Sequence, residues 1–298
     1  MGSLVFLPCL DSDEIAETHR RELNVFRHVA AQLGRSAVEA ARLGYYVNAN
    51  GDQVDWGDAV QAACEAKVSI APMSRLPVMA ARDSIETLVQ VTNETTLQAA
   101  RRLVERGLRP LALNFANGIE PGGGFLGGAR AQEEVLCRSS ALYATLVGDA
   151  MYQHHKGRPL PDSTEWAIYS PDVPVFRTDA GGVLDKPWLL SFVTCAAPYA
   201  PAVGQPASRD LLRGRICRML EIARGYGHQT LVLGAWGCGA FGNDPHDTAS
   251  DFRAALESEF DGAFLEVVFA ITDWSPERRF LGAFRDVFSR RRVAAAGS

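Results

Sequence analysis

The chain has 298 residues, of which 47% are hydrophobic and 22% are charged, and its formal net charge is −5. This length predicts one large domain or two small ones with a sizeable core. The acidic balance argues against sequence-specific nucleic-acid binding by a broad basic surface, although a local cleft can still hold a polyanion. No stretch reaches the ~20 apolar residues that cross a bilayer, and no signal-peptide pattern is evident. The six scattered cysteines form no CxxC pair, which argues against a zinc ribbon and fits a cytoplasmic protein.

Residues 1–80 are predicted to form a helical extension packed on a catalytic core of residues 81–298. The stretch 11–34 opens with cap-type residues and ends at a glycine, and Asp58 is expected to cap a short helix over 58–66. No low-complexity linker separates the two parts, so they are expected to form a single globular unit.

Strands and helices alternate from about residue 85 onward. Strands are predicted over 85–92, 110–115, 165–170, 173–177, 187–195, 230–234 and 265–271. Helices are predicted over 94–107, 132–150, 209–225, 247–260 and 276–291, and residues 151–165 are expected to form a loop. Thr92 or Asn93 is the expected cap of the first of these helices. Several strands are apolar without alternation, which is typical of a sheet covered on both faces and predicts a three-layer α/β protein.

The most informative segment, residues 114–134, reads NFANGIEPGGGFLGGARAQEE. A nucleotide-hydrolase phosphate loop would need GxxxxGK[ST], and the required Lys and Ser/Thr are absent here. A dinucleotide-binding loop fits better, because Gly122, Gly124 and Gly127 match GxGxxG between a strand and a helix. However, Asp149 lies in the wrong context for its acidic partner, and that interpretation leaves the Gln-Glu-Glu triplet unexplained.

A third interpretation is that the loop wraps a diphosphate and presents it to two carboxylates. Glycine lets backbone N–H groups approach a bulky anion closely. Carboxylates beside such a loop indicate acid/base chemistry, although Glu133 and Glu134 could also simply favour a helix N-terminus. A second glycine-rich segment, WGCGAFGN at 236–243, also follows an apolar strand, so two loops could clamp a diphosphate from two sides.

Residues 121–134, PGGGFLGGARAQEE, resemble the signature of bacterial-type poly(ADP-ribose) glycohydrolases. The segments LALNFANG, IYSPDVPVFR, TCAAP and LVLGAWGCGAFGNDP resemble segments of the same family in the same order. The resemblance covers roughly residues 85–290 and, less distinctly, the N-terminal helices. It implies a macrodomain fold, with three α/β/α layers, a mixed central sheet and a helical extension, that binds ADP-ribose at the strand ends. Tyr199 departs from the small or amide residue of many relatives.

The resemblance also implies roles for individual residues. Glu134 matches the catalytic glutamate, Glu133 and Asn117 match residues that hold the terminal ribose, and Gln132 belongs to the same substrate-binding signature. Phe241 matches a ring that packs on that ribose. The diphosphate contacts fall on Gly122, Gly123 and Gly124 and on the second loop, Gly237, Cys238, Gly239, Ala240, Phe241, Gly242 and Asn243.

The chemistry of the implied reaction suits these residues. Cleavage of a ribose–ribose bond passes through an oxocarbenium-like state and needs an acid to protonate the leaving oxygen. Glu134 could be that acid and then the base that activates water. Glu133 cannot easily share the role, because adjacent helical residues point ~100° apart. No metal or cofactor is expected, since the chain has no HExxH and no clustered Asp/His set.

Some residues keep two interpretations. Phe125 fits a core anchor or a ligand contact, and Trp236 fits the core or the pocket. Cys238 fits a packing residue better than a nucleophile, because no partner histidine is indicated. His154 and His155 lie in a polar stretch and are expected to be solvated.

The resemblance therefore implies a glycosidase that acts on poly(ADP-ribose) or ADP-ribosylated protein, releases ADP-ribose, serves the DNA damage response and is a monomer. Two other functions stay open at this point: a macrodomain that binds ADP-ribose without cleaving it, and an NAD-dependent oxidoreductase. Asn117, which is followed by a glycine, fits a turn residue as well as a ligand contact.

Overall fold

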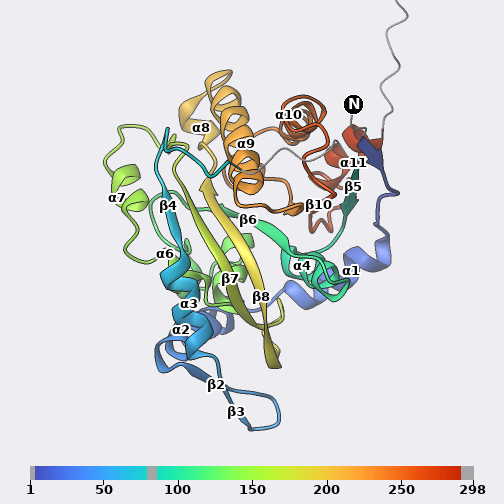
Figure 1. The fold of residues 1–298 in the computed structure, drawn as a ribbon. Coiled ribbons are helices and arrows are strands. Elements are labelled where there is room, and N and C mark those ends of the chain that lie inside the picture. Colours follow the sequence, from blue (N-terminus) through green and yellow to red (C-terminus); the bar gives the residue numbers. More distant parts are fainter. Residues whose placement is uncertain (1–3, 79–85, 290–298) are drawn as a thin grey trace, which may run out of the picture.

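The computed structural model describes residues 4–78 and 86–289, which form a central sheet between two layers of helices (Figure 1). The predicted boundary at residue 80 lies outside the described residues, as do Ile85 of one predicted strand and Arg290 and Arg291 of the last predicted helix. In chain order the elements are β1 (Leu4–Phe6), α1 (Asp13–Leu23), α2 (Arg27–Leu43), β2 (Tyr45–Val47), β3 (Gln53–Asp55), α3 (Gly57–Ala66), β4 (Val68–Ile70), β5 (Thr87–Thr92), α4 (Thr96–Glu105), β6 (Pro110–Ala116), the short 3₁₀ turn η1 (Phe125–Gly127), α5 (Gln132–Ser139), α6 (Leu142–Leu146), α7 (Ala150–Lys156), β7 (Ala167–Arg177), β8 (Val183–Ala196), α8 (Ala200–Val203), α9 (Ala207–Gly225), β9 (Thr230–Leu233), α10 (Pro245–Glu257), β10 (Glu266–Ala270) and α11 (Leu281–Ser289).

The sheet is mixed, as the family resemblance implies. Its strand order is β1-β5-β10-β9-β6-β8-β7-β4. In this order, each neighbouring pair from β1 through to β8 is parallel, whereas β7 is antiparallel to both of its neighbours, β8 and β4. The carboxyl ends of the parallel strands therefore meet at one edge, where ligands bind in open α/β sheets.

The N-terminal segment contributes more than helices. Strands β1 and β4 form the two outer edges of the sheet, and β2 and β3 form a separate hairpin. This hairpin was missed in the sequence, because its two strands are only three residues long. Its turn is held by the Asn48 side chain, which accepts the backbone N–H groups of Asn50 and Asp52. The division into an extension and a catalytic core stays a prediction.

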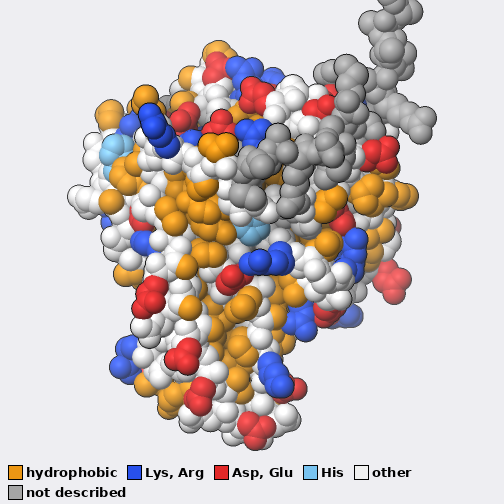
Figure 2. All heavy atoms as spheres, viewed as in Figure 1, with side chains coloured by type: hydrophobic (Ala, Val, Ile, Leu, Met, Phe, Trp, Pro, Cys, Tyr) orange, Lys and Arg blue, Asp and Glu red, His pale blue; other side chains and the backbone are white. Residues whose placement is uncertain are grey.

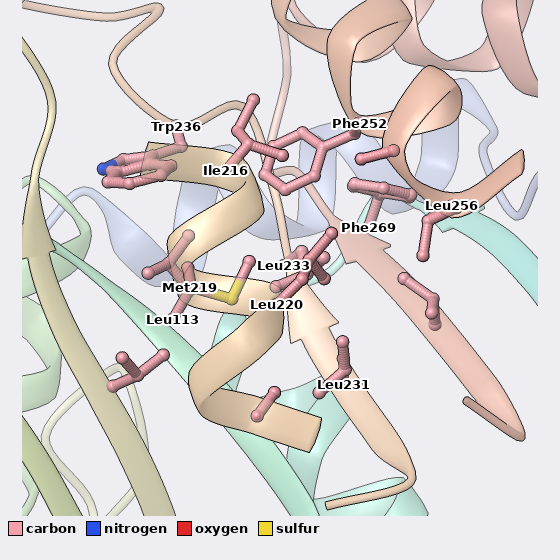
Figure 3. Packing of buried hydrophobic residues seen from close by; sticks show 14 of the residues in the cluster. Leu113, Ile216, Met219, Leu220, Leu231, Leu233, Trp236, Phe252, Leu256 and Phe269 are labelled. Atoms are coloured by element: carbon pink, nitrogen blue, oxygen red, sulfur yellow. The ribbon is translucent and has the colours of Figure 1, made fainter. Parts of the chain in front are cut away.

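Both faces of the sheet are buried, which explains the apolar strands. Along β6, Leu111 and Leu113 belong to one apolar cluster and Ala112 to the other. Residues of α9, α10 and α11 complete the first cluster, part of which is drawn in Figure 3, and residues of α2 to α7 complete the second. Alternate strand residues thus point to opposite faces, and each meets a helical layer.

Several helices differ from the prediction. The stretch 11–34 holds two helices, α1 and α2, which break at 24–26, and α4 is capped by Thr95, whose side chain accepts the backbone N–H of Gln98. The helix predicted over 132–150 splits at Ser140 and again at Gly148, which has φ +76°. Asp149 then caps α7, which occupies part of the predicted loop 151–165.

The bounds of other strands and helices also differ from the prediction, each for a local structural reason. The strands predicted over 165–170 and 173–177 are one strand, β7, with an irregularity between Ser170 and Val173. The helix predicted from 276 begins at Leu281, because the Asp273 carboxylate accepts the backbone N–H groups of Phe280 and Leu281. Asp58 lies in the first turn of α3, whose N-cap is Trp56.

The surface shows no large area of one charge on the face in Figure 2, where acidic and basic side chains are mixed with apolar ones. Within the two described ranges, no helix is long and apolar enough to span a bilayer.

Candidate active site

The Gln-Glu-Glu triplet begins α5, directly after the first glycine loop. Acidic residues in a first helical turn are favoured by the helix dipole, but these two are also buried, with Glu133 3% and Glu134 9% exposed. Buried carboxylates are costly unless they are hydrogen-bonded. Both receive hydrogen bonds from the segment that follows β6, so strand end, loop and helix form one unit.

Glu133 is held by the backbone and by one neighbouring side chain. Its Oε2 accepts the N–H of Asn117 at 2.7 Å, and its Oε1 accepts from the side-chain amide of Asn114 at 3.3 Å. The pKa of Glu133 is raised to about 8, mainly by burial and also by the nearby Glu134, against the lowering effect of the Asn117 N–H. A carboxyl group fixed at both oxygens is suited to orient a ligand.

Glu134 is held on one side only. Its Oε1 accepts the N–H of Gly124 at 3.0 Å, whereas its Oε2 is buried without a hydrogen-bond partner among the described residues. A buried oxygen that lacks a partner is costly in the free protein. It is therefore a strong candidate to meet a ligand atom.

The first loop fits against these carboxylates only because it has no side chain there. A Cβ on Gly123 would lie 2.5 Å from Oε1 of Glu134 and 3.0 Å from Oε2 of Glu133, and φ of Gly123 is +57°. Gly122 also has a positive φ and packs against the Phe125 ring. Phe125 is 1% exposed, so it is a core anchor, one of its two predicted roles.

Gln132 ties α5 to β6. Its Oε1 accepts the N–H of Phe115 at 2.9 Å, and its Nε2 donates to the carbonyl of Leu113 at 2.7 Å and to Oγ1 of Thr96 at 3.1 Å. These bonds fix where the helix begins and hence where both glutamates point. Gln132 also lines the cavity described below, and its predicted substrate contact stays a prediction.

Asn117 shows the turn role that the sequence left open. Its Oδ1 accepts the backbone N–H groups of Ile119 and Glu120, both at 3.0 Å. Its Nδ2 has no hydrogen-bond partner within residues 4–78 and 86–289, and the residue is half-buried. The turn therefore orients the free amide N–H₂ group, and the ribose contact stays a prediction.

The second loop, Gly237 to Asn243, is held by neutral groups. The Asn243 side chain donates to the carbonyls of Pro198 and Gly237 and accepts from the Ser208 hydroxyl. Asn243 is buried, as is Cys238, and burial raises the pKa of the Cys238 thiol to about 12. Cys238 is thus an inert packing residue, and Asn243 is engaged within the protein rather than open to a ligand.

The rest of this loop is open. Gly239, Ala240 and Gly242 are exposed, and the half-buried Phe241 ring lies edge-on to Tyr199, with ring centroids 6.1 Å apart. Trp236, just before the loop, is 0% exposed and packs in the core near Met219 and Leu113 (Figure 3). Of its two predicted roles, the core role is therefore the observed one.

A cavity of about 450 Å³ lies between the two loops at the strand ends. Its wall includes Ala131 and Gln132 at the start of α5, Ala235 and Gly239 after β9, and Phe115 of β6. Further lining comes from α5, from the α1–α2 junction and from segments that follow β5, β7 and β10: Leu23, Asn24, Glu94, Thr95, Thr96, Arg130, Val135, Leu136, Asp179, Ala270, Ile271, Thr272, Trp274 and Phe280. Glu133 and Glu134 do not line this cavity, although they follow Gln132 directly in α5.

Three buried polar residues near the site were missed in the sequence. Asn114 is 0% exposed and supports Glu133, and its position within an otherwise apolar strand could have revealed it. Asp179 lines the cavity, and burial raises its pKa to about 6. The Tyr152 hydroxyl is buried without a partner in the described chain, and burial followed by Glu133 raises its pKa.

His155 corrects one prediction. It is 4% exposed, whereas His154 is exposed as expected. The ring bonds the Gly118 carbonyl through Nδ1 at 2.9 Å, and its Nε2 accepts the N–H of Thr164. Burial lowers the pKa of His155 to about 4, so the neutral ring pins the turn that follows Asn117. Its burial depends on contacts between segments far apart in sequence, which local polarity does not reveal.

No group of three or more metal-ligating side chains that could hold an ion occurs within residues 4–78 and 86–289. The described cysteines are all free thiols.

Comparisons with known proteins place the chain in a family. The microbial-type PARG catalytic domain matches residues 34–178. The crystal structure of poly(ADP-ribose) glycohydrolase from Thermomonospora curvata is 40% identical, covers 87% of this chain and 99% of its own, and has a TM-score of 0.82. A second structure of that enzyme, bound to the inhibitor ADP-HPD, is 39% identical with the same coverage and a TM-score of 0.80.

A further match is the poly(ADP-ribose) glycohydrolase of Deinococcus radiodurans in complex with ADP-ribose. It is 39% identical, covers 77% of this chain and 96% of its own, and has a TM-score of 0.71. No curated protein sequence matches the chain. With its mixed macrodomain-like sheet, its paired buried glutamates and these likenesses, the chain belongs to the microbial-type poly(ADP-ribose) glycohydrolase family.

Proposed function

We propose that this protein is a glycosidase that hydrolyses the ribose–ribose O-glycosidic bonds of poly(ADP-ribose) and releases ADP-ribose. The observation that carries the proposal is the geometry of Glu134. One of its oxygens is fixed by the Gly124 N–H, and the other is buried without a partner in the described chain. The relative from Deinococcus radiodurans was crystallised with ADP-ribose, which supports the same ligand here.

The diphosphate lies between the two glycine loops. Gly122 to Gly124 bring backbone without side chains to one side, although the N–H groups of Gly123 and Gly124 are already donated to the Glu120 carbonyl and to Glu134. In the second loop Gly239 and Gly242 are exposed, and glycine backbone of this kind lets a bulky anion approach closely. The terminal ribose then lies over Glu133 and the free amide of Asn117, with the Phe241 ring as its cover.

The cavity beside Gln132 takes the adenosine. Its volume of about 450 Å³ falls within the range of small-molecule pockets, ≈ 300–1,000 Å³. Apolar walls suit the base. The carboxylates of Glu94, which is paired with Arg102, and of Asp179, which accepts the Thr95 hydroxyl, keep further lone pairs for an exocyclic amine or a ribose hydroxyl. Since Gly239 and Ala131 belong to its wall, the diphosphate lies at the cavity's edge and the terminal ribose beyond it.

The reaction follows from this placement. Protonated Glu134 gives its proton to the oxygen that bridges two riboses while the bond from that oxygen to the anomeric carbon breaks. The shortened chain leaves with a free hydroxyl, and the ribose carries oxocarbenium-like charge. Glu134, now a carboxylate, takes a proton from a water molecule as that water attacks the anomeric carbon. The acid is thereby restored, and ADP-ribose is released.

Several residues act by positioning rather than by contact with the reacting atoms. Gln132 fixes the start of α5, Asn114 supports Glu133, and His155 holds the turn after Asn117. Such support matters because a misplacement of about 1 Å can cost 10²-fold in rate.

The experiment is incubation with polymer of defined length, followed by sizing of the products. The proposal expects free ADP-ribose and shortened chains. A binding-only macrodomain would leave the polymer intact. An NAD-dependent oxidoreductase would instead bind NADH tightly in a fluorescence titration and transfer hydride, which would overturn the proposal.

The cellular setting is part of the proposal. We place the enzyme in the cytoplasm, as a monomer without sequence-specific nucleic-acid binding, where it removes polymer from ADP-ribosylated proteins during the DNA damage response. The free thiols of the described cysteines support a reducing compartment.

A further inference from the structure

An exposed aromatic ring lies where α1 joins α2. Phe26 is 74% exposed and stacks on His28, with centroids 5.9 Å apart and an interplanar angle of 20°. An exposed phenylalanine of this kind is unfavourable unless it meets a partner. We call the surface around it the Phe26 patch, and it consists of Phe26, Arg27, His28, Arg35, Leu126 and Arg130.

The arginines of the Phe26 patch carry positive charge that no carboxylate neutralises. Arg27 donates from Nε to the Gly127 carbonyl, and Arg35 donates from Nη1 to the Leu126 carbonyl. Arg130 donates from Nη1 to Asn24 and Val25. In the part of the chain that the structure describes, none of the three forms an ion pair.

A neighbour on the same helix shows the contrast. Arg42, also exposed on α2, is paired with Glu39 at 2.6 Å. The bonds to neutral carbonyls orient the guanidinium groups of Arg27 and Arg35 and leave their remaining N–H groups for another acceptor. A protein with a net charge of −5 thus keeps a local cluster of unpaired cations beside an exposed ring.

The Phe26 patch adjoins the proposed substrate site. Arg130 and Asn24 line the cavity, and the turn at Gly127 and Gly128 packs directly on the start of α2, where Gly128 has no room for a side chain against the Arg27 carbonyl. A polymer segment joined to the ribose of the adenosine in this cavity, on the side away from the reacting bond, leaves over this rim and passes the patch.

We propose that the Phe26 patch binds a flanking ADP-ribose unit of the polymer, with an adenine stacked on Phe26 and a diphosphate paired with Arg27 and Arg35. This rests on the proposed function. Aromatic platforms beside cations are how proteins hold single strands of nucleic acid without reading sequence. Each unit of poly(ADP-ribose) repeats the same two groups, a base and a diphosphate, whereas a single ADP-ribose is already accommodated by the cavity and the loops.

The test compares binding of long poly(ADP-ribose) and of single ADP-ribose by variants in a Glu134→Gln background, which prevents turnover during the titration. Phe26→Ser and Arg35→Gln each remove one feature of the patch at an exposed site. Phe26→Trp keeps a stacking ring. Arg42→Gln is the matched control, because it makes the same charge change on the same helix outside the patch.

We expect Phe26→Ser to weaken polymer binding by about tenfold, the scale of one lost base stack, with no change for ADP-ribose. Phe26→Trp should restore polymer affinity. Arg35→Gln should also weaken polymer binding and lower its dependence on salt, whereas Arg42→Gln should alter neither.

Equal losses for polymer and for ADP-ribose would overturn the proposal, because the patch would then only shape the cavity. No loss for either ligand would overturn it as well. Failure of the proposed function is a separate result, since the wild-type chain would then release no ADP-ribose from polymer or would not bind ADP-ribose at all.

Discussion

The two glycine loops follow parallel strands and have similar sequences, yet the structure builds them differently. The first rests on two buried carboxylates, Glu133 and Glu134, which accept its backbone N–H groups. The second rests on the neutral side chain of Asn243 and holds an inert thiol, Cys238. Glycine content marks where a diphosphate can approach, whereas the groups beneath the loop decide whether proton chemistry takes place there.

The largest difference in activity and stability between the two loops is expected when one glycine in each loop is replaced by alanine. Gly123→Ala places a methyl group 2.5 Å from the Glu134 carboxylate at a residue with φ +57°, so the carboxylate must move and activity should fall about 100-fold. Gly239→Ala meets nothing within 4 Å, and its melting temperature should match wild type. Steady-state rates and thermal unfolding check both. Equal melting temperatures and rates for the two variants would contradict the distinction.

A pH-dependent effect is expected beneath the first loop. Because burial raises the pKa of Glu133 to about 8, the folded protein binds more protons than the unfolded chain above the ordinary pKa. The free energy of unfolding therefore falls as pH rises from about 4.5 toward 8. Glu133→Gln removes this loss. The free energy of unfolding of the variant, measured against that of the wild type, should therefore be higher at pH 9 than at pH 5, by on the order of a few kcal/mol. The measurement is thermal unfolding of both proteins from pH 5 to pH 9. Melting temperatures of wild type and variant that change in parallel with pH would contradict the prediction.

The second loop is supported by the neutral side chain of Asn243, whose contribution to stability should not depend on pH. Asn243→Ala removes the bonds to Pro198, Gly237 and Ser208 and should cost about 1–3 kcal/mol of stability, independently of pH between 5 and 9. Because the proposed contact of this loop is with the diphosphate and not with the reacting bond, KM should rise more than kcat falls. Urea unfolding and kinetics measure this, with Ser208→Ala as the milder control. A loss confined to kcat would contradict it.

The smallest effect concerns the turn after Asn117. The pKa of His155 is lowered to about 4 by burial, so stability falls as pH drops from 6.5 through about 4, where the unfolded chain binds the proton more readily. His155→Gln should lose this component, so its unfolding free energy between pH 7 and 4.5 should change by about 1 kcal/mol less than that of the wild type. His228, whose pKa is also lowered by burial, keeps the remaining acid sensitivity. Identical pH profiles would exclude the role of His155.

The sequence predicted the alternating core of the fold because the strands of a doubly covered sheet are continuous apolar runs. Strand β6 and the helix start at Gln132 lie where the pattern placed them. Short elements were missed. Strand β4 and the two strands of the β2–β3 hairpin have three residues each, which is too few to show an alternating pattern of apolar and polar residues. The strand order depends on long-range pairing, which no local pattern specifies.

Site residues that belong to a local sequence motif could be predicted, whereas those defined by tertiary contacts could not. Glu133 and Glu134 are recognisable because they follow a rare glycine pattern. Asn114, His155 and Asp179 were missed, since each is significant only through partners far apart in the chain, such as Thr95 beside Asp179. The Asn243 side chain supports its loop, a role that a glycine-rich motif alone does not reveal, and its substrate contact stays a prediction.

The central claim is that Glu134 moves the proton at the bond between two riboses. The most direct measurement compares wild type and Glu134→Gln for release of ADP-ribose from polymer and for ADP-ribose affinity by calorimetry. The variant amide can still accept the Gly124 N–H, so affinity should be unchanged, while release should fall about 10³-fold. Release at the wild-type rate, with affinity intact, would contradict the assignment.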